Sequence, residues 1–169
     1  MSPELSLPRD KILVIGLGNE LRADDAAGLQ VARLLQRRNL PGVQVREFTG
    51  DGAEMMEAWA GFPLVIVIDA TRPVKRAGTV YRFAGHHQPL PAAWFNLSTH
   101  SFGLAEAVEL SRSLQRMPDE LIVYGIEGGN FGLGHPVSSA VAASIQSVFE
   151  AALAEIQERL PSIPPPLGA

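Results

Sequence analysis

Short apolar segments alternate with amphipathic segments along most of this chain. Continuous apolar runs at 11–17, 64–68 and 121–126 predict fully buried strands, and the alternating pattern at 43–48 predicts a half-buried strand. A further short strand is expected at 79–83. The chain therefore contains enough strand-forming segments for a sheet with a buried centre.

Between these runs the apolar residues recur at helical spacing. Helices are expected over about 24–38, 53–60, 104–114 and 141–156, and loops over 84–97 and 127–136. Strands that alternate with helices predict an α/β domain in which helices cover both faces of a mostly parallel sheet.

Composition narrows the class of protein. The 169 residues fit one domain over 1–160, followed by a proline-rich tail at 161–169 that is expected to be extended and disordered. With no cysteine, the chain has no disulfide, thiol nucleophile or iron–sulfur cluster. The net charge of −4 and the scattered basic residues argue against nucleic-acid binding. Because no signal-peptide pattern and no apolar run of membrane-spanning length occur, a cytoplasmic protein without membrane contact is expected.

Polar residues gather where the predicted strands end. Asp24 and Asp25 lie in the glycine-flanked loop 16–28 after the first strand, Asp69 follows the most apolar strand, and His100 precedes a helix. Sheets of this class place their sites at the carboxyl ends of the strands. We expect Asp24 to cap the following helix, which leaves Asp25 to point into the cleft.

A divalent metal would suit this set of side chains. A carboxylate at the end of a buried strand is costly unless it is paired or binds a metal, although hydrogen bonds from loop amides would also satisfy Asp69. Two carboxylates and one imidazole are ligands for a metal of borderline character and leave positions open for water or substrate. His86 and His87 are expected to be solvated, and His135 to cap or pack.

A dinucleotide site is the main competing interpretation of the loop at 16–28. Gly16 and Gly18 follow a strand and precede a helix, but Leu21 stands where the fingerprint requires a third glycine. The acidic pair Asp24-Asp25 would also repel a pyrophosphate at the helix N-terminus. The pattern therefore favours a metal site.

Four segments, in order, resemble the maturation endopeptidases of nickel–iron hydrogenases. The loop GLGNELRADDAAG matches the family's first signature, and VIVIDA matches a strand that ends in Asp69. The segment STHSFGL carries His100 and Gly103, and in YGIEGGNFGLG the last apolar strand runs into a glycine-rich loop. The resemblance covers most of residues 11–155.

The resemblance implies a fold, a site and a substrate. Members are monomeric α/β/α proteins with a twisted five-stranded sheet in which one strand is antiparallel. Nickel ligands carry over to Asp25, Asp69 and His100. From the chemistry of the residues, the catalytic candidates are Asp24, Asp25 and Asp69. Contacts with the substrate are assigned to three motif residues, Gly18, Asn19 and Gly103.

The implied activity is removal of a short C-terminal peptide from the large-subunit precursor of a nickel–iron hydrogenase. The precursor carries the nickel, which acts as the recognition element, and a nickel- or carboxylate-activated water is the candidate nucleophile. Loops 84–97 and 127–136 are expected to select the precursor. A non-proteolytic nickel-binding chaperone and a nucleotide-binding α/β domain are the alternatives.

Overall fold

A single five-stranded sheet forms the centre of the structure. The computed structural model describes residues 10–160, so the tail predicted at 161–169 lies outside the described residues. The strand order is β2-β1-β3-β5-β4, and only β4 runs antiparallel to its neighbour. The strands are β1 (Ile12–Leu17), β2 (Val43–Phe48), β3 (Leu64–Thr71), β4 (Val80–Ala84) and β5 (Glu120–Glu127).

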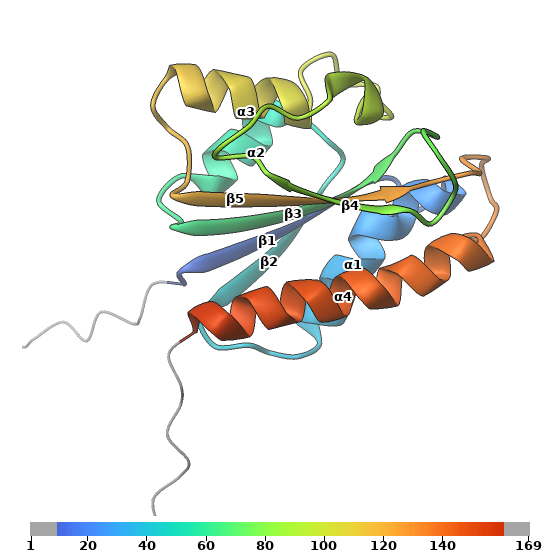
Figure 1. Cartoon of the computed structure of the whole chain (residues 1–169), viewed down its shortest axis with the longest axis horizontal. Coiled ribbons are helices and arrows are strands. Elements are labelled where there is room, and N and C mark those ends of the chain that lie inside the picture. Colours follow the sequence, from blue (N-terminus) through green and yellow to red (C-terminus); the bar gives the residue numbers. More distant parts are fainter. Residues whose placement is uncertain (1–9, 161–169) are drawn as a thin grey trace, which may run out of the picture.

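Helices cover both faces of this sheet, which confirms the predicted three-layer α/β/α architecture (Figure 1). The elements α1 (Ala27–Gln36) and α4 (Ser139–Arg159) lie on one face. The other face carries α2 (Gly52–Trp59) and α3 (Leu104–Ser113). Two short 3-10 helices, η1 (Ala23–Ala26) and η2 (Ala92–Trp94), lie in the connections.

Alternate side chains of the buried strands fill two cores. Ile12 and Val14 pack on the side of α1 and α4, whereas Leu13 and Ile15 pack on the side of α2 and α3. By length and composition α4 would be able to cross a membrane. Its apolar face, however, packs against the sheet and α1, as expected for a core helix.

Two predicted boundaries were wrong in the region of the site. The helix expected from residue 24 begins at Ala27, because Ala23 has a φ of 48° and residues Ala23–Ala26 form a 3-10 turn. The strand expected to end before Asp69 continues to Thr71, because Asp69 still pairs with Gly125 of β5. Asp69 therefore projects from a regular strand near its carboxyl end.

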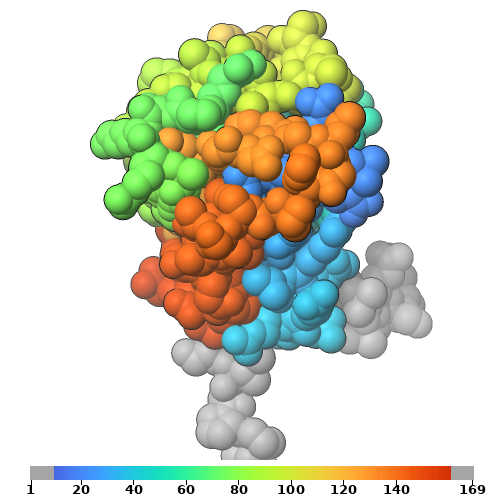
Figure 2. Space-filling view, turned by 90° about the vertical axis from the view of Figure 1, so that its right-hand side faces the viewer, coloured from blue at the N-terminus to red at the C-terminus, as the bar shows by residue number. Residues whose placement is uncertain are grey.

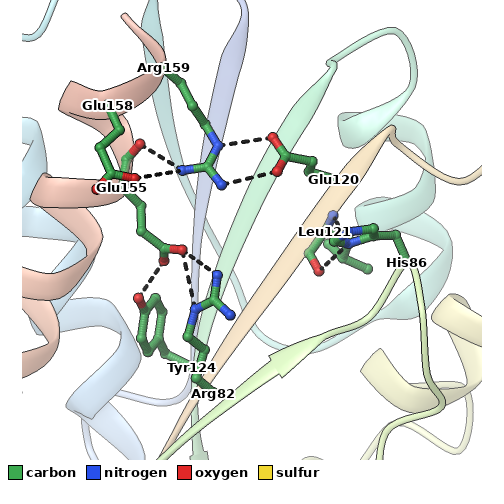
Figure 3. Close-up of polar contacts among 8 residues, drawn as sticks. All are labelled: Arg82, His86, Glu120, Leu121, Tyr124, Glu155, Glu158 and Arg159. Atoms are coloured by element: carbon green, nitrogen blue, oxygen red, sulfur yellow. Dashed lines mark hydrogen bonds and ion pairs between the residues drawn. The ribbon is translucent and has the colours of Figure 1, made fainter.

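A polar network ties the antiparallel edge of the sheet to α4 (Figure 3). The Glu155 carboxylate of α4 accepts hydrogen bonds from Arg82 of β4 and from the hydroxyl of Tyr124 on β5. One turn further along α4, Arg159 donates to both carboxylate oxygens of Glu120, at 2.9 and 3.0 Å. These contacts fix β4 at one side of the sheet, whereas β2 forms the other side.

Candidate active site

The loop after β1 folds back tightly on itself. Gly18 has a φ of 144°, and a Cβ atom there would lie 1.9 Å from the carbonyl oxygen of Asp25. Gly28 is equally confined, since its Cβ would lie 2.2 Å from the carbonyl oxygen of Ile68. The glycines thus let the start of α1 approach the ends of β1 and β3, and this approach brings Asp25 toward Asp69.

Asp24 serves as an anchor for a distant loop. Its carboxylate accepts hydrogen bonds from the amides of Gly129, Asn130 and Ser138 at 2.8–2.9 Å and from the Ser138 hydroxyl at 3.1 Å. Burial alone would raise the pKa of Asp24, but these hydrogen bonds outweigh it and lower the pKa. The predicted helix-capping role was wrong, because the carboxylate caps neither η1 nor α1.

The anchored segment crosses the carboxyl end of the sheet. Figure 2 looks onto this end and shows residues 128–138 (orange) lying against the loop after β1 (blue). The two segments also share backbone hydrogen bonds, from Asp24 to Asn130 and from Gly134 to Leu21. Asp24, fully buried beneath them, does not line the cleft described next.

Asp25 and Asp69 line one narrow cleft at the carboxyl ends of β1 and β3. Each side chain belongs to a residue that is only 8% exposed. The cleft has a volume of about 10 Å³, which is room for about one water molecule or ion. Its other walls come from four segments, with lining residues Leu17, Gly18, Thr49, Gly50, Phe95, Leu97, Ser98, Gly103 and Leu104.

The two carboxylates disfavour each other's charge. Burial raises the pKa of Asp69 well above its ordinary value, and the neighbouring Asp25 raises it further. Burial also raises the pKa of Asp25, although a hydrogen bond from the Asn19 amide at 2.9 Å and the charge of Arg22 offset part of this effect. Such a pair can share a proton or accept a cation, and both are ways to relieve the repulsion.

His100 lies at the margin of the cleft rather than in it. Its Nε2 atom is 3.1 Å from the hydroxyl of Thr49, and its amide donates to the Ser98 hydroxyl. The imidazole is exposed, whereas Thr49 and Ser98 line the cleft. Within residues 10–160 no three His, Cys, Asp or Glu side chains are grouped closely enough to hold a metal ion. The structure therefore brings together Asp25 and Asp69 of the predicted triad. His100 is not in the cleft but contacts Thr49, which lines it.

The remaining predicted residues fall into three groups. Gly18 and Gly103 line the cleft, and Asn19 lines a hollow beside it. His87 and His135 are exposed, but His86 is half-buried and accepts a hydrogen bond from the amide of Leu121, so its expected solvation was wrong. The ring of the exposed His135 lies beside Gly132 within the same loop.

Two polar residues near the strand ends escaped the sequence analysis. Thr49 follows the half-buried strand β2 at the same sheet edge as the acidic residues, and this position was the available signal. Glu127, which ends β5, is 1% exposed and accepts hydrogen bonds from the Lys75 amide and the Tyr81 hydroxyl. Burial would raise the pKa of Glu127, but these hydrogen bonds lower it. Glu127 is thus a structural carboxylate.

Comparisons with known proteins agree with this geometry. A family model described as hydrogenase maturation protease matches residues 29–155. The hydrogenase 2 maturation protease of Escherichia coli (strain K12) is 29% identical over 152 residues, which cover 88% of this chain and 92% of that protein. The match to the family model includes Asp69 and His100 and begins after Asp25.

Solved structures give the same result. The hydrogenase maturating endopeptidase HybD from E. coli superposes with a TM-score of 0.74 at 27% identity, over 88% of this chain and 93% of that one. The NiFe hydrogenase maturation protease HybD from Thermococcus kodakarensis has a TM-score of 0.68 at 30% identity, over 86% and 98%. Fold, sequence and family model agree, and the chain belongs to the hydrogenase maturation protease family.

Proposed function

We propose that this protein removes a short C-terminal peptide from the nickel-loaded precursor of a nickel–iron hydrogenase large subunit. The observation that carries the proposal is the convergence of Asp25 and Asp69 in one cleft. Membership of a peptidase family supports the hydrolytic reaction. We place the reaction in the cytoplasm, in keeping with a chain that lacks cysteine, and we assign it to the monomer.

In this proposal the nickel belongs to the substrate. Asp25 and Asp69 offer two oxygen ligands whose mutual repulsion a cation would relieve. His100, which contacts Thr49 at the margin of the cleft, supplies the third ligand once the precursor docks. A precursor without nickel cannot be held by these three ligands and binds poorly. The enzyme would therefore distinguish loaded from unloaded precursor by an interaction that the unloaded one cannot make.

Hydrolysis requires an activated water molecule beside the scissile bond. The cleft has space for about one such molecule, and two carboxylates with raised pKa values are suited to hold and transfer its protons. Polarisation of that water by the substrate's nickel is the alternative route. Asp24 takes no part in either route, because four hydrogen bonds occupy its oxygens.

The test uses the cognate precursor, prepared with and without nickel. Mass spectrometry should show loss of a C-terminal peptide only when the nickel-loaded precursor is mixed with the protein. The variants Asp25→Asn, Asp69→Asn and His100→Gln should each abolish processing, while circular dichroism shows an intact fold. Binding of the loaded precursor without cleavage would instead establish a non-proteolytic chaperone.

A further inference from the structure

A second hollow adjoins the cleft on the side of β2. It has a volume of about 360 Å³ and shares Gly18 and Thr49 with the cleft. The loop after β1, α1 and the end of β2 supply the rest of its lining, namely Asn19, Glu20, Leu21, Leu29, Arg33, Glu47 and Phe48. A ligand in this hollow would therefore extend directly into the cleft.

The backbone of β2 is unpaired along this side. Within the described part of the chain β2 pairs with β1 alone. The carbonyl of Phe48 points toward β1 and accepts a hydrogen bond from the amide of Gly18. Because the backbone groups of successive residues in a strand point to opposite sides, the N–H and C=O groups of Val45 and Glu47 point away from β1. An open strand edge of this kind is a template for another extended chain.

The side chains around the edge fit a peptide with apolar residues. Leu21 is 63% exposed and lines the hollow together with two other apolar side chains, Leu29 and Phe48. Across the hollow Arg33 bridges Glu20 and Glu47, with N–O distances of 3.1 and 2.7 Å. These ion pairs balance the charges of the three charged side chains in the lining against one another.

We propose that the C-terminal segment of the precursor binds here as an extended strand beside β2, so that its scissile bond reaches Asp25 and Asp69. This inference rests on the proposed function and adds how the substrate is held. The six residues of β2 would support about 20 Å of extended peptide. Main-chain hydrogen bonds would supply affinity, and the hollow around Leu21 would supply selectivity.

The experiment measures kcat and KM with the nickel-loaded precursor. Val45→Pro removes the outward N–H, and an edge strand tolerates proline where its nitrogen faces away from the sheet. We expect KM to rise about fivefold to tenfold, as for one lost hydrogen bond, with kcat within about twofold. Val45→Ala, which shortens the same side chain but keeps the amide, is the control and should leave KM nearly unchanged.

A second pair of variants covers the case in which Val45→Pro does not fold. Leu21→Ser should raise KM about threefold to tenfold. Leu114→Ser, at a leucine that is 51% exposed at the end of α3, should not. Normal kinetics for Val45→Pro and Leu21→Ser, with an active wild type, would overturn the docking inference alone. An inactive wild type would overturn the proposed function and this inference with it. A wild-type dimer that Val45→Pro converts to monomers would show that a second copy occupies the edge.

Discussion

The carboxylate of Asp24 accepts hydrogen bonds from both the amide and the hydroxyl of Ser138, although 114 positions separate the two residues. The adjacent Asp25 has one amide donor and faces a second carboxylate. Neighbouring residues of the same type therefore have opposite roles: Asp24 stabilises the loop that crosses the site, and Asp25 lines the site itself.

This difference predicts a large loss of stability for Asp24→Ala. The change would leave the amides of Gly129, Asn130 and Ser138 without their acceptor, at a cost of about 3 kcal/mol or more. Urea unfolding at pH 7 measures it. The exposed Asp119, changed to Ala, is the control and should stay within about 0.5 kcal/mol of wild type.

The Asp24 contribution should also depend on pH. Because the folded-state pKa is lowered, the contribution is present above the ordinary value of 3.8 and is lost as the pH falls through the folded-state pKa. Unfolding measured from pH 7 down to pH 2 should therefore show the wild type and Asp24→Ala converging at the acidic end. A constant difference down to pH 2 would contradict this explanation.

Asp69→Asn should separate stability from activity. The raised pKa of Asp69 means that its ionisation destabilises the fold, so its contribution is full below the ordinary value of 3.8 and is lost as the pH rises through the folded-state pKa. The amide variant should be more stable than wild type at pH 8 and should process no precursor. Thermal unfolding at pH 4 and pH 8 tests the sign: an advantage that grows toward pH 4 would refute it.

Thr49 should position His100. Thr49→Val keeps the shape of the side chain but removes the hydroxyl that contacts Nε2 of His100 at 3.1 Å. We expect kcat/KM for the precursor to fall roughly threefold to tenfold, as for one hydrogen bond. Thr49→Ser, which retains the hydroxyl, should recover most of the activity, and equal activity of both variants would rule out this positioning role.

The network around Glu155 should show coupling between its members. Glu155→Gln and Tyr124→Phe each remove part of the connection between α4 and the sheet (Figure 3). We expect each to cost about 1–2 kcal/mol in unfolding free energy, and the double variant to cost less than the sum. Strict additivity in urea unfolding would show that the hydrogen bond between them contributes nothing.

Much of the fold was predictable because it depends on local pattern. The runs that became β1, β3 and β5 are apolar because helices cover both faces of these strands. The family resemblance implied one antiparallel strand without saying which, and the pairing of β4 with β5 identifies it. The first residue of α1 was predicted wrongly because the hydrogen bonds between Asp24 and the amides of Gly129, Asn130 and Ser138 help to set the local backbone conformation, and these partners are distant in sequence.

Part of the site was also predictable. Asp25 and Asp69 were expected to lie close together because both come near the ends of parallel strands, whose carboxyl ends meet at one edge of the sheet. The sequence already pointed to Asp25 rather than Asp24 in the cleft, but it did not show that Asp24 binds the amides of a distant loop, because that depends on which backbone groups approach its carboxylate in the folded chain. Thr49 was missed for a comparable reason: its partner is a histidine 51 positions away.

The anchoring of residues 128–138 by Asp24 bears on how members of this family could exchange substrates. Suppose this loop is replaced by the loop of a relative that has a different partner. The new loop would have to keep the backbone amides at 129, 130 and 138 within hydrogen-bond distance of Asp24. Without them Asp24, and with it the backbone next to Asp25, would lose its fixed position. The anchor thus divides the loop into fixed ends and a middle, residues 131–137, in which Gly134 has to be retained because its amide donates to the carbonyl of Leu21. Chimaeras confined to that middle should keep the cleft intact while their preference among precursors changes.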